Sequence, residues 1–187
     1  MQRKWMTVSA VLLAVAVLAC GCDIKKKSIN GPLPSGAPLC VNEFLASNHT
    51  YPDEFGENDD FIEVYNRTDR AINLAGYGVT DDLTQHTKYV IPSGSAAVTT
   101  IQPKGFLMIW CDGQPEQGPL HTTFKLSASG EQIGLYESSG DALDELTFGP
   151  QTDDVSCGRI PDGGSTWQTF ATPTPGATNG SGTRPRP

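Results

Sequence analysis

The sequence predicts an all-β protein built as a two-layered sandwich. Short runs rich in β-branched and aromatic residues recur roughly every ten residues, and each run ends at Gly, Pro, Asn or Asp. The run Asp60–Asn66 mixes aromatic and β-branched residues with polar ones, and we interpret it as a half-buried strand. This rhythm is typical of a sandwich and not of a helical bundle.

Composition fits one domain of ordinary size flanked by tails. The chain has 187 residues, of which 37% are apolar, with 20 Gly and 14 Pro, which is enough for one hydrophobic core. Acidic residues outnumber Lys and Arg by 21 to 13, so the formal net charge is -8. Because an acidic surface repels phosphate backbones, the sequence argues against direct nucleic-acid binding.

The N-terminus has the pattern of a bacterial export signal. Two basic residues precede an apolar run, Val8–Leu18, which is too short to span a bilayer comfortably. The following Ala19-Cys20-Gly21-Cys22 resembles the lipobox of bacterial lipoproteins, in which a cysteine thiol receives a diacylglycerol before cleavage. We expect lipid on Cys20, with Cys22 as the alternative. An ordinary cleaved signal with incidental cysteines is the competing interpretation.

The sequence divides into four parts. A lipoprotein signal peptide covers residues 1–19, and a Pro- and Gly-containing tether without regular structure is expected over residues 20–38. The sandwich covers residues 39–179, and a disordered tail is expected over residues 180–187. Acyl chains such as palmitate would then hold the exported domain on a membrane of the bacterial cell envelope.

Within the sandwich, two runs carry more information than the others. The fully apolar run Phe106–Cys111 is expected to be the central strand, because both of its faces need cover. Gly76 and Gly78 predict a place where another chain segment approaches closely. The predicted strands are residues 39–45, 60–66, 71–82, 88–91, 106–111, 131–136, 143–148 and 155–160.

Short motifs occur along the sandwich in a characteristic order and spacing. They are Asn42-Glu43, Asp60–Asn66, Asn73–Tyr77, Pro103–Phe106, Phe124–Leu126 with Gly130-Glu131, Gly158–Gly163 and Thr174–Gly176. Together they resemble the lamin tail domain over residues 39–179. The resemblance implies an immunoglobulin-like β-sandwich. It also implies a module that binds or anchors and does not catalyse.

We therefore expect a non-catalytic binding or scaffolding module of a lipid-anchored envelope protein. Its partner would be an unknown protein or an envelope polymer, in addition to the membrane. Related bacterial modules are sometimes fused to nucleases or phosphatases, but no second domain is expected here, so that activity should not transfer. An accessory or weak hydrolase and a calcium-dependent adhesin are the alternatives. His49, His86 and His121 lie in separate loop-like regions without a catalytic motif, which disfavours an enzyme.

Carboxylates in and before the run Asp60–Asn66 are the candidate metal ligands. Calcium binds hard oxygen donors in flexible loops, and an acidic cluster of this kind lies just before Glu63: Asp53, Glu54, Glu57, Asn58, Asp59 and Asp60. Asp59, Asp60 and Glu63 are the predicted ligands. A solvated acidic loop is the competing interpretation, and no other cofactor is expected. Glu43 alternates onto the same side as Val41 and Leu45, and Glu63 onto the same side as Phe61 and Tyr65, so each should point inward and be paired or coordinated. Arg159 and the backbone amides of the acidic cluster are the candidate structural partners, and calcium is the functional one.

Five cysteines in an exported chain favour disulfide formation. If Cys20 carries the lipid, then Cys22, Cys40, Cys111 and Cys157 are available. We expect a bond between Cys111 and Cys157, because both lie in or beside late strands that a sandwich can bring together. Buried free thiols are the alternative. A zinc site is not expected, since the globular part has neither Cys-x-x-Cys nor paired histidines.

Overall fold

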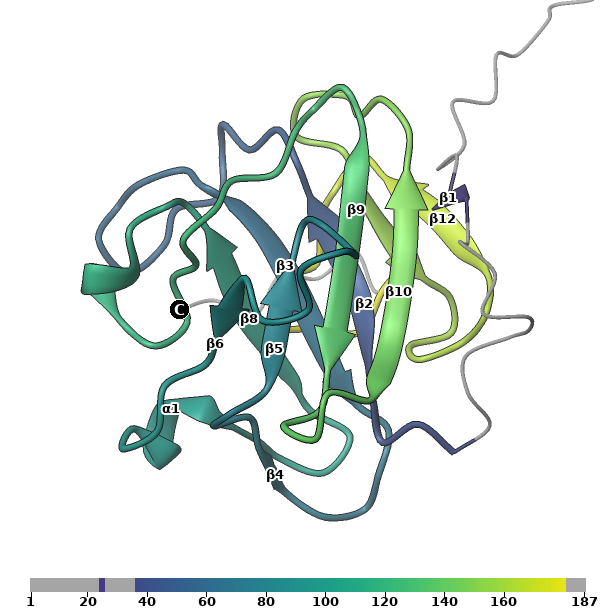
Figure 1. The fold of residues 1–187 in the computed structure, drawn as a ribbon. Helices are drawn as coiled ribbons and strands as arrows, with labels where there is room; N and C mark the ends of the chain where they lie inside the picture. The colour runs from purple at the N-terminus through teal and green to yellow at the C-terminus, as the bar shows by residue number, and fades with distance from the viewer. Residues whose placement is uncertain (1–23, 26–35, 181–187) are drawn as a thin grey trace, which may run out of the picture.

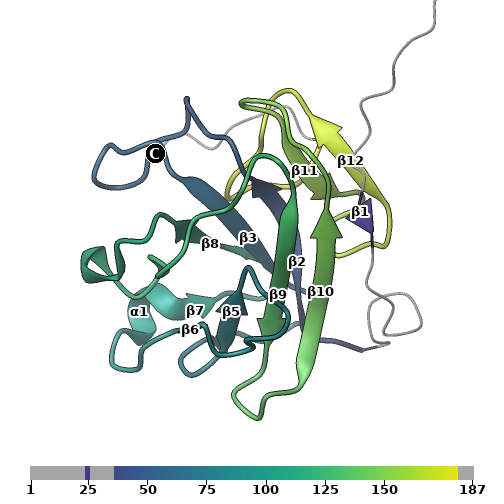
Figure 2. The same cartoon turned by 45° about the horizontal axis from the view of Figure 1, so that its top comes forward.

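Two five-stranded antiparallel sheets face each other and form the sandwich (Figures 1 and 2). The computed structural model describes residues 24–25 and 36–180. Strands dominate this part of the chain, and its two helical segments are each no longer than one turn. The predicted all-β, two-layered architecture is confirmed.

Each sheet joins strands that are distant in sequence. In order across the first sheet, the strands are β1 (Ile24–Lys25), β10 (Ala142–Phe148), β9 (Glu131–Tyr136), β5 (Gly78–Thr80) and β6 (Tyr89–Val90). Across the second sheet they are β12 (Trp167–Phe170), β11 (Ser156–Arg159), β2 (Leu39–Leu45), β3 (Asp60–Asn66) and β8 (Phe106–Cys111). The remaining elements are the paired strands β4 (Ile72–Asn73) and β7 (Thr100–Ile101), the helix α1 (Ala96–Thr99) and the 3-10 helix η1 (Pro115–Gln117).

The core lies between the sheets and follows the alternation of the strands. Ile62 and Val64 of β3 belong to the main core cluster, together with Ile133 and Leu135 of β9. Phe61 belongs instead to a smaller cluster on the outer face of the second sheet. Full burial of each aliphatic side chain stabilises the fold by about 1.5–3 kcal/mol. The two-residue period predicted for Asp60–Asn66 therefore decides which face is buried in the core.

Strand β8 lies at the edge of the second sheet, so the prediction that it is central is wrong. The middle position belongs to β2, in which every residue is buried. The free edge of β8 is covered by the segment that follows it. Trp110 N–H donates to the Leu120 carbonyl at 2.7 Å, and Thr122 N–H donates to the Trp110 carbonyl at 2.8 Å. An edge strand shielded in this way can be as apolar as a central one.

Strand β1 falls within the predicted tether. Ile24 and Lys25 pair with Phe148 and Thr147 of β10, so the expectation of an unstructured tether is wrong at these two positions. The signal peptide, residues 26–35 and the tail from residue 181 lie outside the described residues. In the part that is described, no helix combines the length and apolarity needed to cross a membrane.

Gly78 occupies the close approach predicted from the sequence. A Cβ atom placed there would lie 2.4 Å from the backbone oxygen of His86. Hydrogen bonds from Gln85 N–H to the Asp82 carbonyl and from Lys88 N–H to the Gln85 carbonyl hold that loop in place. The absence of a side chain at Gly78 thus allows the loop before β6 to fold back onto β5.

We predict that Gly78→Ala lowers the free energy of unfolding by about 1–3 kcal/mol, because the backbone must move to relieve the overlap. Urea unfolding followed by tryptophan fluorescence measures this change. Ser93→Ala, in the exposed loop after β6, is the control and should stay within about 0.5 kcal/mol of the wild type. Equal stability of Gly78→Ala and the control would contradict the close approach.

Candidate functional site

The outer face of the second sheet carries two buried carboxylates. Glu43 and Glu63 lie opposite each other on β2 and β3, and both are fully buried, as predicted. The segment after β12 satisfies them. Thr174 N–H donates to Glu43 Oε1 at 3.0 Å, and Gly176 N–H donates to Glu63 Oε2 at 2.6 Å. These carboxylates therefore hold the C-terminal segment on the sheet.

Hydrogen bonding around Glu43 favours its protonated form. Thr174 Oγ1 lies 3.0 Å from Glu43 Oε2 and 2.9 Å from Asn179 Oδ1. A hydroxyl has one hydrogen to donate, so both contacts are satisfied when Glu43 is protonated and donates to Thr174. Burial raises the pKa of Glu43, although the Ser156 hydroxyl and Thr174 oppose the shift. Burial also raises the pKa of Glu63 well above its usual range.

A buried ion pair joins the two sheets. Arg159 Nη2 on β11 donates to Asp144 Oδ2 on β10 at 2.6 Å, and both side chains are almost completely buried. Arg159 Nε donates to the Val41 carbonyl at 2.7 Å, and the guanidinium lies 4.4 Å from the centre of the Trp167 ring. The predicted pairing of Arg159 with Glu43 or Glu63 is wrong, because the Arg159 guanidinium binds Asp144 instead.

The predicted disulfide between Cys111 and Cys157 does not form. Cys111 and Cys40 are buried free thiols, whereas Cys157 is disulfide-bonded, so its partner lies outside the described residues. Two strands separate β8 from β11 in the sheet. At about 4.8 Å per strand, that separation exceeds the Cα–Cα reach of a disulfide. Cys20 and Cys22, the predicted lipidation sites, also lie outside the described part of the chain.

The predicted calcium ligands do not form one group. Glu63 is occupied by the C-terminal segment, Asp60 Oδ1 accepts from Asn48 N–H at 3.3 Å, and Asp59 lies 3.6 Å from Lys125 Nζ. Successive residues of a strand point to opposite faces. Asp60 and Glu63, three residues apart on β3, therefore point to opposite faces of the sheet.

Two groups of side chains do converge at one end of the sandwich. Ligand atoms of Asp53, Glu54 and His121 lie within 4.8 Å of one another, and so do those of Asp53, Glu57 and Asp59. The carboxylates come from the loop between β2 and β3, and His121 comes from the segment that covers the edge of β8. Of the three predicted ligands, Asp59 belongs to one of these groups, and the other acids in them come from the predicted acidic cluster.

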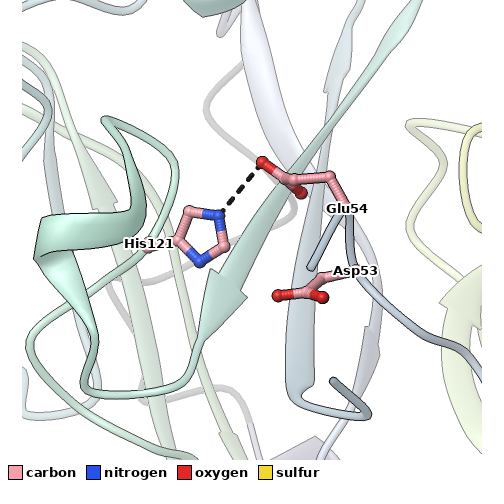
Figure 3. A group of neighbouring side chains, drawn as sticks. All are labelled: Asp53, Glu54 and His121. Atoms are coloured by element: carbon pink, nitrogen blue, oxygen red, sulfur yellow. Dashed lines mark hydrogen bonds and ion pairs between the residues drawn. The ribbon is translucent and has the colours of Figure 1, made fainter. Parts of the chain in front are cut away.

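His121 is the most constrained member of this site (Figure 3). Its ring is fully buried, Nδ1 is hydrogen-bonded to Asp112 Oδ2, and Nε2 lies 3.2 Å from Glu54 Oε1. Burial disfavours the imidazolium, but the hydrogen bonds to Asp112 and Glu54 outweigh it and raise the pKa of His121. The carboxylates of Glu54 and Asp53 lie on the same side of the ring.

Comparison with protein families identifies the fold. The Lamin Tail Domain family model matches residues 34–150, well over half of the chain. The chain belongs to the lamin tail domain family. A search of curated proteins finds no match. The lamin tail domain is an immunoglobulin-like, non-enzymatic module suited to binding or scaffolding. The match ends before β11 and β12, which complete the second sheet.

The histidines of this lamin tail domain lie in three separate places. His49 is exposed and 3.9 Å from Asp153, and His86 is exposed and stacked on Tyr136. His121 and Asp112 form a buried pair that resembles part of a hydrolytic triad, but the Nε2 atom faces a carboxylate and not a nucleophilic hydroxyl or thiol. The arrangement is suited to holding a cation.

Sequence reasoning missed His121 because its partners lie far away in the chain. No local motif joins His121 to Asp53 and Glu54. The two segments meet through long-range contacts, among them the ring contact of Phe55 with His121 and the hydrogen bond from Gln117 Nε2 to Glu57 Oε2. One sequence feature could have indicated His121: it lies in the segment that directly follows the apolar strand β8. A histidine that lies inside an edge-covering segment is shielded from water and needs a partner.

We predict that Glu43→Gln becomes increasingly stabilising, relative to the wild type, as pH rises from about 5 to 8. Because folding raises the pKa of Glu43 above its ordinary value of 4.5, this residue stabilises the folded protein at pH values below 4.5. Its contribution to the free energy of unfolding is lost as pH rises through the folded-state pKa. Glutamine reproduces the protonated form, because its amide N–H can donate to Thr174 Oγ1. Urea unfolding across this pH range measures the difference.

Glu116→Gln, at an exposed carboxylate on η1, is the matched control, and its difference from the wild type should stay constant with pH. Parallel stability curves for Glu43→Gln and the wild type would show that Glu43 is ionised in the folded protein.

We predict that Arg159→Met lowers the free energy of unfolding by about 3–5 kcal/mol, because it leaves the buried Asp144 carboxylate without its cation. Replacing both partners, as Arg159→Met with Asp144→Leu, should restore part of the loss. Chemical denaturation measures both. Arg70→Met, at an exposed arginine, is the control, and a comparable loss there would contradict this role for the ion pair.

Proposed function

We propose that the protein is a lipid-anchored lamin tail domain that binds or scaffolds a partner at the bacterial cell envelope. The observation that carries this proposal is the sequence Ala19-Cys20-Gly21-Cys22 at the end of an export-type apolar run, upstream of a family binding module. The acyl chains supply membrane attachment, and the sandwich supplies the binding surface.

We propose Cys20 as the acylated residue. Acylation converts the thiol into a thioether, so the same sulfur cannot also form a disulfide. Cys157 is disulfide-bonded while Cys40 and Cys111 are free. If Cys20 carries the lipid, Cys22 is the thiol left to pair with Cys157. A disulfide at Cys20 would therefore exclude acylation of Cys20. A disulfide is also consistent with export into an oxidising compartment.

The charge of the domain restricts the partner. The sequence pI is about 4.7, so the surface attracts basic partners and repels polyanions such as nucleic acid. An envelope protein or polymer with a basic face is therefore the proposed class of partner. The absence of a hydroxyl or thiol nucleophile at His121 Nε2 among the described contacts supports binding over hydrolysis.

Metabolic labelling with alkyne-palmitate tests the anchor. In a bacterial host, the full chain and Cys22→Ala should incorporate the label, whereas Cys20→Ala should not. Non-reducing peptide mapping of the wild type should find Cys22 linked to Cys157. Failure of the wild-type chain to incorporate label would contradict the lipoprotein proposal, and a Cys20–Cys157 link would contradict acylation of Cys20.

A further inference from the structure

Three potential metal ligands already have the spacing of a coordination site. His121 Nε2 and Glu54 Oε1 are 3.2 Å apart, and one ligand atom each of Asp53, Glu54 and His121 lie within 4.8 Å of one another. Tetrahedral zinc has bonds of about 2.0–2.2 Å, which place neighbouring ligand atoms roughly 3.3 Å apart. A small movement of the Asp53 carboxylate toward His121 and Glu54 would bring all three ligand atoms to this spacing. The two loops therefore present a nearly formed site.

Asp53 supplies an independent sign of a missing partner. The residue is 9% exposed, and its Oδ1 accepts from Phe55 N–H at 2.8 Å and Glu57 N–H at 2.9 Å. Its Oδ2 atom is buried and has no hydrogen-bond partner among the described residues. A buried carboxylate oxygen without a donor is costly. The Asp53 carboxylate lies beside the His121 ring (Figure 3), where a bound cation would satisfy it.

Asp112 prepares His121 to act as a ligand. Its side chain is fully buried and holds Nδ1 of the imidazole. In the neutral ring this hydrogen bond places the proton on Nδ1 and leaves the lone pair of Nε2 directed toward Glu54. A carboxylate that orients a histidine in this way is the usual outer partner of a metal-bound imidazole.

The surrounding charge also favours a cation. Glu57 and Asp59 lie next to Asp53, and the neighbouring base Lys125 is 3.6 Å from Asp59. Even with His121 protonated, carboxylates at this end of the sandwich outnumber the bases paired with them. The Glu54 side chain is 60% exposed, so an ion can enter from solvent and keep an open coordination position.

We propose that Asp53, Glu54 and His121 bind a divalent transition-metal ion of the zinc class. Imidazole nitrogen suits zinc and its neighbours, whereas calcium takes six to eight oxygen ligands. This proposal replaces the calcium prediction. It also departs from the sequence-based expectation of no zinc site, because one histidine with two carboxylates can provide three protein ligands. The fourth position is open to water or to a donor from a binding partner.

Isothermal titration of the metal-free full chain in detergent with zinc chloride tests the site. One ion should bind per chain. Glu54→Gln and Asp53→Asn should each raise Kd at least tenfold. Glu54 is exposed, so its variant keeps the fold, and Asn at position 53 keeps the oxygen that accepts from Phe55 and Glu57. Glu116→Gln and His49→Gln are matched controls and should bind within twofold of the wild type.

Three results would overturn the proposal. They are the absence of saturable zinc binding, unchanged affinity in both Glu54→Gln and Asp53→Asn, and calcium binding more tightly than zinc. NMR of ¹⁵N-histidine-labelled protein provides a second readout: zinc should shift His121 Nε2 while Nδ1 stays protonated. A shift at His49 instead would place the ion elsewhere. Neither experiment depends on acylation, so the lipid anchor and the metal site can fail separately.

Discussion

A buried Arg159–Asp144 ion pair is the constraint on which the rest of the structure depends. It joins β11 in the second sheet to β10 in the first, and Arg159 also binds the backbone of the central strand β2. Such a pair is costly to bury and more costly to break. It fixes the relative position of the sheets, so that the opposite face of β2 and β3 can receive the C-terminal segment through Glu43 and Glu63.

Two kinds of buried acid follow from this framework. Asp144, Glu43 and Glu63 each meet a donor or cation from within the chain. Asp53, at the end of the sandwich, keeps one buried oxygen without such a partner in the described structure. The first kind stabilises the fold, and the second points to a ligand. This distinction separates the structural acids of this lamin tail domain from its candidate binding site.

Local sequence patterns predicted most of the strands but not their order. They missed β1, β7 and β12, and the single strand expected over residues 71–82 is two strands, β4 and β5, in different sheets. Asp60–Asn66 is a strand, as predicted, but the side expected to point inward is the wrong one, because Ile62 and Val64 face the main core while Phe61 and Glu63 lie on the opposite face of the sheet. Gly78 correctly marked a close backbone approach. The apolar run of β8 was misleading because the segment around Leu120 shields its edge. Asp53 and Glu54 stood in the predicted acidic cluster, but His121 could not be predicted as their partner, because it lies 67 residues after Glu54 in the chain. Long-range pairing, which leaves no local period, decided both outcomes.

The acids of the two sheets are satisfied by groups within the chain, and we propose that those at the end of the sandwich are completed by an ion. Crystals of the full chain grown with zinc, with diffraction recorded on both sides of the zinc absorption edge, test it most directly. The account predicts one anomalous peak between Asp53, Glu54 and His121 and no peak beside Glu43 or Glu63. A peak at the two glutamates, or none at His121, would contradict it.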